Sequence, residues 1–175
     1  MKKIFYFKGF TLIELLVSIV IIGILTTAVV ASSPAAKQGF ALMRSSQGLA
    51  QDIRRAQVKA TAMKEIGGLS PKGYGIYLTT GSPYLYILFA DQDGDHTYNE
   101  GEGDTLIETI NLETDVKISA LLPGSPLNIV FEPPNPTVWV NNSSTSSSTI
   151  TLYLENNVTK IREIFVNSSG LITTQ

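Results

Sequence analysis

The sequence predicts an α+β protein, in which a long N-terminal helix packs on an antiparallel β-sheet or small β-sandwich. Residues 10–31 form an almost uncharged apolar stretch, and residues 32–66 continue it with apolar residues three or four positions apart, as in an amphipathic helix. Residues 67–175 are divided instead into short segments rich in β-branched and aromatic residues, separated by Gly, Pro, Asn and Ser. We therefore expect an apolar helix, its amphipathic continuation and a β-rich globular domain.

Composition limits the partners and the chemistry of the chain. Its 175 residues are enough for one domain with a hydrophobic core. The formal net charge is −2, and it would be −5 without Lys2, Lys3 and Lys8, which precede the apolar stretch; nucleic acid is therefore disfavoured as a partner. Because the chain has no cysteine, disulfide bonds, thiolate catalysis and cysteine-based metal sites are excluded. No nucleophile–base pair or phosphate-binding glycine motif stands out, and we expect no enzymatic activity.

The apolar stretch predicts a membrane-spanning helix. It has one charged residue between Phe10 and Ala31, and about 22 residues at about 1.5 Å each cross a hydrocarbon layer of about 30 Å. Three lysines precede the stretch, and the next basic residue is Lys37. Since positively charged segments stay on the cytoplasmic side of a membrane, this pattern places the N-terminus in the cytoplasm and the β-rich domain outside.

Glu14 is an unexpected residue in this stretch. A carboxylate in an apolar membrane helix costs several kcal/mol unless it is neutralised or paired, so Glu14 needs a partner that one isolated chain does not supply. Gly9 and Phe10 stand just before the helix, and a glycine followed by a bulky apolar residue is an accessible peptide for a protease at the cytoplasmic face. Cleavage between them would create an α-amine on Phe10, four residues from Glu14.

The segment KGFTLIELLVSIVIIGIL resembles the processing segment of type IV prepilins and type II secretion pseudopilins, with Gly9, Phe10 and Glu14 at the family's spacing. The resemblance implies that residues 1–9 are a leader, that a prepilin peptidase cuts between Gly9 and Phe10, and that the new amine is methylated. It also implies that Glu14 pairs with the Phe10 amine of a neighbouring subunit. Buried together in an apolar filament core, these two charges would enforce axial register, because a misplaced subunit leaves one unpaired.

Two other interpretations of the N-terminus stay open. A conventional secretory signal would be cleaved after a small-residue site such as Val29-Val30-Ala31, although its apolar part usually has about 7–15 residues and no acid. A plain membrane anchor would leave Gly9, Phe10 and Glu14 without a role. Looser resemblances, in IRRAQVKA at 53–60 and TLYLENNVTKIREIFVNSSGLITT at 151–174, are to H-type minor pseudopilins and minor pilins of the fimbrial T type.

Beyond residue 31 the periodicity predicts a helix with one buried face. We expect it to continue the membrane helix as one rod from Phe10 to Lys64, loosened at Pro34 and Gly39. Gly67 and Gly68 are expected to end it. The residues expected on its buried face are Leu42, Ser46, Leu49, Ile53, Ala56, Ala60 and Met63.

The globular domain is expected to be a sheet with one buried face and one in water. Ile150, Leu152 and Leu154 alternate with residues that would face the other way, which is typical of such a strand. Tyrosines in these segments are expected in the core or on half-exposed sheet faces; they are Tyr74, Tyr77, Tyr84 and Tyr86. The nine predicted strands are Tyr74–Thr79, Tyr84–Ala90, Thr105–Leu112, Val116–Leu121, Leu127–Glu132, Thr137–Asn141, Thr149–Glu155, Lys160–Val166 and Leu171–Thr173.

An acidic loop lies between the second and third predicted strands. Oxygen-bearing residues fall at positions one, three, five, seven, nine and twelve of an EF-hand-type calcium loop: Asp91, Asp93, Asp95, Thr97, Asn99 and Glu102. The loop departs from that motif because His96 replaces the glycine expected at position six, and because no second helix is predicted after it. It is therefore interpreted either as a structural Ca²⁺ site or as a solvated Asp-, Gly- and Asn-rich turn, with His96 as a loop residue.

These features lead to a main functional hypothesis and a rival. The main hypothesis is a structural subunit, a pilin or minor pseudopilin, of a type IV pilus-like filament or type II secretion pseudopilus. Its partners would be other pilin or pseudopilin subunits, the prepilin peptidase and, before assembly, the lipid of the cytoplasmic membrane. Assembly would place it in a periplasmic or cell-surface filament. The rival is a membrane-tethered, calcium-dependent binding module, which would have no use for Glu14.

Overall fold

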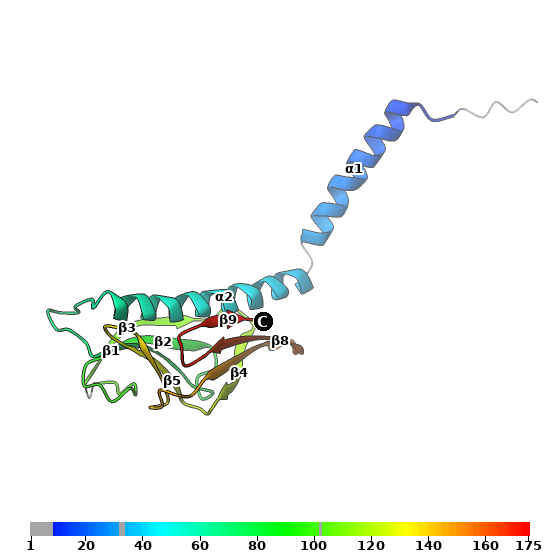
Figure 1. The fold of residues 1–175 in the computed structure, drawn as a ribbon. Coiled ribbons are helices and arrows are strands. Elements are labelled where there is room, and N and C mark those ends of the chain that lie inside the picture. The colour runs from blue at the N-terminus through cyan, green and yellow to red at the C-terminus, as the bar shows by residue number, and fades with distance from the viewer. Residues whose placement is uncertain (1–8, 32–33, 102) are drawn as a thin grey trace, which may run out of the picture. The chain divides into compact units, whose positions relative to one another are not determined.

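The computed structural model describes residues 9–31, 34–101 and 103–175, which belong to two compact units, Met1–Gly39 and Phe40–Gln175. The first unit holds helix α1 (Leu12–Ala31) and the beginning of helix α2 (Pro34–Thr61). The second unit holds the rest of α2 and the nine strands of the described residues (Figure 1). The predicted α+β class is confirmed.

Helix α1 is apolar on every side. Its window Leu12–Val29 has a mean hydropathy of 2.6 and is nowhere buried within the chain. By length and composition it is the one helix of the described residues that could cross a membrane. A helix without a polar face needs lipid or other apolar helices around it. The three lysines on which the predicted orientation depends lie outside the described residues.

Helix α2 begins at Pro34, so the structure has two helices where we predicted one loosened rod. Proline is well placed in the first turn of a helix, because its missing N–H would have no intrahelical partner there. Gly39 lies inside α2 and does not interrupt it. Residues 32 and 33 are outside the described part of the chain.

The end of α2 also differs from the prediction. The helix stops at Thr61, and Met63 just beyond it has a left-handed backbone with φ of 45°. Gly67 and Gly68 do not end the helix. They form a tight turn between Ile66 and Leu69, with φ of 60° and 79°. The backbones of Ile66 and Leu69 exchange two hydrogen bonds, of 2.9 and 3.0 Å. Glycine suits both positions because it adopts positive φ without steric cost.

One face of α2 packs on the strands, as its periodicity predicts. Figure 1 shows the helix lying along one side of the sheets. Met63 is the exception to the prediction, since its side chain is 58% exposed because it lies beyond the last helical turn. The other predicted residues are all buried: Leu42, Ser46, Leu49, Ile53, Ala56 and Ala60.

The strands form two antiparallel sheets, which makes the β-rich region a small sandwich rather than one sheet. The first has the order β3-β2-β1-β5-β6 and the second β4-β7-β8-β9. Side chains from both sheets and from α2 join in one hydrophobic core. The strand bounds are β1 Gly73–Leu78, β2 Leu85–Asp91, β3 Asp104–Asn111, β4 Val116–Leu122, β5 Leu127–Glu132, β6 Thr137–Val140, β7 Ser148–Leu154, β8 Asn157–Val166 and β9 Ile172–Thr174.

All nine predicted strands are present. The largest boundary difference is in β8, which begins at Asn157 rather than Lys160. This extra length pairs with β7 across a register shift after Tyr153. The predicted alternation of β7 is confirmed, because Ile150, Leu152 and Leu154 are buried and the residues between them are partly exposed.

The predicted tyrosines take the two expected environments. Tyr74 and Tyr86 are buried, whereas Tyr84 is half-exposed. The hydroxyl of Tyr86 donates a 2.6 Å hydrogen bond to Asp52 Oδ2 of α2, which ties the helix to β2, an inner strand of the first sheet. Burial and this carboxylate raise the pKa of Tyr86 well above its ordinary value, so it stays a donor at neutral pH.

Gly75 in β1 shows how closely the first sheet is packed. A Cβ atom at this position would lie 2.7 Å from Phe89 Cε1 and 2.9 Å from Val130 Cγ2. The glycine therefore makes room for two large neighbours on the adjacent strands β2 and β5. Any side chain here would force rings or backbone apart.

Candidate functional site

The start of α1 is organised around a reciprocal contact between Thr11 and Glu14. The N–H and the hydroxyl of Thr11 both donate to Glu14 Oε2, at 3.3 and 3.2 Å. The N–H of Glu14 in turn donates to Thr11 Oγ1 at 3.2 Å. This is a capping box, which satisfies N–H groups that have no intrahelical partner. We did not predict this role for Thr11 and Glu14, although Thr-x-x-Glu before an apolar run is the sequence signature of a capping box.

Gly9 and Phe10 precede the helix in an irregular, exposed segment. The Phe10 side chain is 80% exposed, and no atom lies near the open side of Gly9. Together with Thr11 and Glu14 they line an open hollow. The structure thus brings all three residues singled out at the N-terminus to one place. Within the described residues, no lysine or arginine pairs with Glu14.

The acidic loop brings together three carboxylates, of which two, Asp91 and Asp93, belong to the set that the EF-hand spacing predicts. Single oxygens of Asp91, Asp93 and Asp104 lie within 4.8 Å of one another. Asp95 is not part of this cluster, and Glu102 lies outside the described residues. Asp104 was not a predicted ligand, because it follows the twelve-residue loop and approaches only when β3 pairs with β2.

Backbone N–H groups hold two of these carboxylates in place. Asp91 ends β2 and is fully buried; its oxygens accept from Gly94 N at 2.5 Å and His96 N at 3.1 Å. Asp104 begins β3 and accepts from Gln92 N at 3.3 Å and Asn99 N at 2.7 Å. The loop is therefore closed by its own side chains, as in a turn, while the same carboxylates converge.

The remaining predicted ligands serve a separate turn. Asp95 Oδ1 accepts from Thr97 N at 2.8 Å, and its Oδ2 accepts from Asn99 Nδ2 at 2.8 Å. A side chain engaged in two such bonds stabilises local chain reversal. The structure therefore places Asp95, Thr97 and Asn99 beside one another, and the backbone N–H groups of Asp95 and Asn99 donate to Asp93 Oδ1 and Asp104 Oδ2 at 3.1 and 2.7 Å.

Burial has the largest effect on the pKa values of the buried carboxyl groups in this cluster. It raises the pKa of both Asp91 and Asp104 above their ordinary value, while backbone N–H donors act in the opposite direction. The neighbouring carboxylates raise the pKa of Asp104 further. A cation placed among these oxygens would remove their mutual repulsion. Oxygen clusters of this kind are the ligands that hard cations such as Ca²⁺ prefer.

His96 occupies the position where an EF-hand loop has glycine, and it keeps the backbone conformation of that glycine, with φ of 62°. Its ring stacks on Trp139 of β6, with centroids 4.1 Å apart and planes 12° apart. Its Nδ1 lies 3.3 Å from Asn142 Oδ1, and its Nε2 lies 3.5 Å from Glu132 Oε2. We predicted only a loop residue, but His96 fastens the acidic loop to the edge of the first sheet.

Comparisons with known proteins give one similarity in sequence and one in fold. Residues 5–30 match the family model of the prokaryotic N-terminal methylation motif. Two crystal structures of the type IV minor pilin FimU of Pseudomonas aeruginosa have similar folds, with TM-scores of 0.54 and 0.53. The identities are 9% and 10%; 77% of this chain is covered, and 87% and 92% of theirs. No curated protein sequence matches the chain.

The two findings are independent of each other. The motif concerns the first helix and the residues before it, whereas the structural similarity concerns how the chain folds. At such low identity the similarity to FimU shows a shared fold, and the motif at residues 5–30 is a separate similarity in sequence. The chain therefore carries the prokaryotic N-terminal methylation motif on a fold similar to that of a type IV minor pilin.

Proposed function

We propose that the chain is a minor subunit of a type IV pilus-like filament or pseudopilus, processed at Gly9–Phe10 and assembled through α1. The observation that carries this proposal is the methylation motif, with Glu14 on a helix that is exposed on all sides, joined to a pilin-like fold. A helix of this composition has two suitable environments, the lipid before assembly and an apolar filament core afterwards. The FimU structures, which are described as those of a minor pilin, support the minor role.

Glu14 would change partners during assembly. In the single chain its carboxylate accepts from Thr11, which lowers the cost of placing it in lipid without neutralising its charge. In the filament, the cleaved and methylated amine of Phe10 on a neighbouring subunit would neutralise it. The two bonds from Thr11 to the carboxylate are exposed and long, at 3.3 and 3.2 Å, so little is lost when an oppositely charged amine replaces them.

The proposed topology is a single membrane pass with the N-terminus in the cytoplasm. The prepilin peptidase would then act at the cytoplasmic face, where the lysine-containing leader lies, and the unit Phe40–Gln175 would be outside the membrane. Its partners would be other pilin-like subunits.

Processing gives the most direct test of this function. We expect cleavage after Gly9, so that the mature chain begins with an N-methylated Phe10. Loss of residues 1–9 would leave 166 of the 175 residues. Intact-mass measurement of the chain from a host with a prepilin peptidase distinguishes this product from all others. Gly9→Val is the control, since a branched side chain at the cut should leave the full-length mass. A mature start near Ser32 would instead reveal a conventional signal peptide and overturn the proposal.

We further propose that the acidic loop binds Ca²⁺ as a structural ion through Asp91, Asp93 and Asp104. The proposal rests on the convergence of their oxygens within 4.8 Å and on the burial of Asp91. Gly103 contributes by leaving space, because a Cβ there would lie 2.7 Å from Asp93 Oδ2. An ion would join the ends of β2 and β3 and stabilise the loop between them.

Calcium is expected to raise the melting temperature of the purified chain in detergent. An ion that binds only the folded state adds RT ln(1 + [L]/Kd), about 2.7 kcal/mol at one hundred times Kd, and sites outside cells have Kd values of about 10⁻⁴–10⁻³ M. Asp104→Asn should remove the effect. Asp95→Asn should keep the calcium-dependent rise in melting temperature if Asp91, Asp93 and Asp104 bind the ion. It should lose that rise if the ligands are those of the EF-hand spacing, which include Asp95. No shift in the wild-type chain at millimolar calcium would mean that the acids form only a solvated turn.

The pH dependence of this effect has a defined sign. Calcium requires ionised carboxylates, so its stabilisation should shrink as the pH falls through the raised pKa values of Asp91 and Asp104, above the ordinary value of 3.8. Without calcium, in chelator, the pH dependence has the opposite sign. Protonated Asp91 and Asp104 then favour the folded state, because folding raises their pKa. This stability is fully present below pH 3.8, the ordinary pKa of the group, and it is lost as the pH rises through the raised pKa values.

A further inference from the structure

Charge is unevenly divided between residues 34–64, which are helix α2 and the three residues after it, and the part of the chain that carries the strands. Residues 34–64 carry six lysines and arginines and one aspartate, a formal charge of +5. Residues 65–175 carry four lysines and arginines and thirteen acids, a formal charge of −9. A chain with a small net charge therefore has a strongly basic helix joined to a strongly acidic β-sandwich. This separation is what electrostatic attachment between copies of one chain requires.

The positive charge is concentrated on the exposed side of the last turns of α2. Four cationic residues surround Val58 and Ala62 and line an open hollow of about 500 Å³. We call this surface the cationic face; its members are Arg54, Arg55, Val58, Lys59, Ala62 and Lys64. Val58 at its centre is 65% exposed, so the face presents an apolar contact within a ring of charge.

Part of this charge has no counterion within the chain. Arg55 pairs with Glu108 at 2.7 Å and lies 3.6 Å from Asp52, and Arg54 donates to the carbonyl of Ile172. Neither Lys59 nor Lys64 has a carboxylate partner among the described residues. Burial, and then repulsion by Lys64 and Arg55, lowers the pKa of Lys59. An acidic partner at this face would relieve that repulsion.

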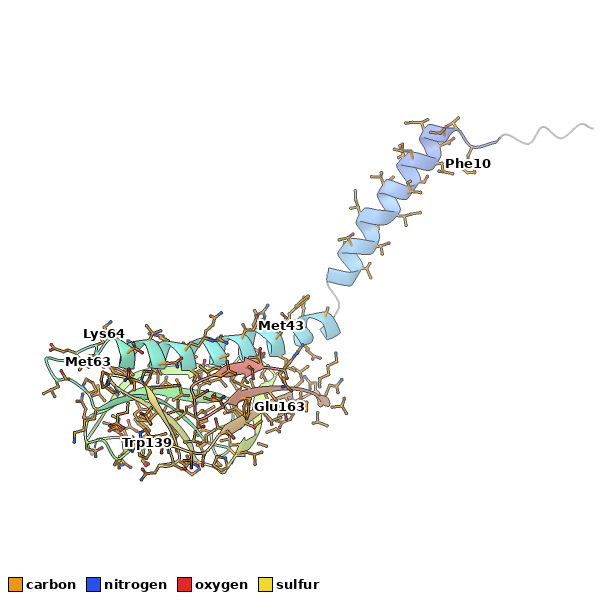
Figure 2. All side chains as sticks on the ribbon, in the orientation of Figure 1. Phe10, Met43, Met63, Lys64, Trp139 and Glu163 are labelled. Atoms are coloured by element: carbon orange, nitrogen blue, oxygen red, sulfur yellow. The ribbon has the colours of Figure 1, made fainter. Side chains whose placement is uncertain are left out.

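The acidic loop cannot supply this partner within one chain, because it lies on another side of the same unit. His96 of the loop stacks on Trp139. Figure 2 shows Lys64 at the end of α2 and Trp139 on the side of the sandwich away from that helix. Glu100 in the loop is exposed; its backbone forms a bridge with Asp104, and its side chain has no hydrogen-bond or ion-pair partner among the described residues.

We infer that the cationic face of one subunit docks the acidic loop around Glu100 of a second copy of this chain. Two different, complementary surfaces make a head-to-tail contact, which leaves one surface of each kind free for further subunits instead of closing as a symmetric dimer does. The inference rests on the proposed role as a filament subunit, and it adds a second contact, outside the membrane, to the one made by α1. Asp91, Asp93 and Asp104 are not needed for it, so a bound ion and a neighbouring subunit can share the loop.

Disulfide trapping tests the contact directly, since the natural chain has no cysteine. Two tagged full-length copies are produced together, one with Val58→Cys and the other with Glu100→Cys, and mild oxidation should yield a mixed dimer. Val158→Cys replaces Val58→Cys in the control, because both valines are 65% exposed and Val158 lies on β8, outside the cationic face. Dimers with Val58→Cys and not with Val158→Cys are expected.

Charge exchange tests the chemistry of the same contact. Lys59→Glu with Lys64→Glu in one copy should reduce co-purification of a differently tagged wild-type copy about fivefold in mild detergent, a modest factor because exposed ion pairs are individually weak. Glu100→Lys in the second copy should restore it. Raising the salt to about 1 M, where the Debye length is about 3 Å, should weaken the wild-type pair and leave anchoring of α1 in detergent unchanged.

Each outcome decides between the proposals. Filaments without the Val58–Glu100 dimer would overturn the docking inference and leave the filament function intact. The dimer without incorporation of the chain into filaments of other pilin-like subunits would support the contact and overturn the function, and absence of both would overturn both. A loss of co-purification with Lys59→Glu and Lys64→Glu that Glu100→Lys does not restore would show that another anionic surface, not this loop, occupies the cationic face.

Discussion

Replacing Glu14 with valine is expected to abolish or strongly slow incorporation of the chain into filaments, while membrane insertion and the β-sandwich stay intact. Removing the carboxylate lowers the free-energy cost of inserting the helix into lipid, by up to about 3 kcal/mol for an acid at the centre of a membrane helix. The filament would then lack the charge that pairs with the Phe10 amine of a neighbour. The measurement is the fraction of the variant in sedimented filaments when it is produced together with wild-type subunits.

Two matched variants separate the charge of Glu14 from its capping role. Glu14→Gln keeps a side chain that can accept from Thr11, since glutamine also forms capping boxes, but it removes the charge. Thr11→Val removes the hydroxyl that caps the helix and keeps the charge. We expect Glu14→Gln to be as poorly incorporated into sedimented filaments as Glu14→Val, and Thr11→Val to be incorporated. If Glu14→Gln assembled as well as wild type, the ionic pair with Phe10 would have no support.

Replacing Ile53 with alanine should destabilise the second unit by about 2–5 kcal/mol, the usual cost of a large-to-small change in a core. Ile53 is fully buried in the contact between α2 and the strands. The chain has one tryptophan, Trp139, whose ring stacks on His96, and its fluorescence can follow unfolding in denaturant. The expected result is a lower denaturant midpoint with an unchanged slope.

The control on the same helix is Val58→Ala. Val58 is 65% exposed on the cationic face, so its truncation should change the stability by less than about 0.5 kcal/mol. Equal effects at both positions would contradict the packing of α2 on the sandwich. Val58→Ala is also informative for the docking contact, because it trims the apolar centre of the cationic face without changing a charge.

Elements that depend on local pattern were predictable from the sequence. The apolar stretch determines that α1 is a helix suited to a membrane, since composition and length alone set that property. The nine strands were recognised because residues with alternating or β-branched character are bounded by turn-forming residues. The buried face of α2 followed from its period, up to the point where the helix stopped before Met63.

Properties that depend on distant residues were decided by the tertiary structure. The order of strands in two sheets places β5 beside β1, and periodicity carries no information on which strands pair. The carboxylate of Asp104 joins Asp91 and Asp93 because β3 returns antiparallel to β2, which spacing within the loop cannot reveal.

The N-terminal motif and the charged surfaces show the same division. The sequence by itself determined the identity and spacing of Gly9, Phe10 and Glu14, because the motif is a run of neighbouring residues. Only the folded chain decided that Lys64 and the loop at His96 lie on different sides of one unit, since packing of the sandwich separates them. Opposite charges held apart by a rigid core cannot neutralise each other within the chain, and they stay available to another copy.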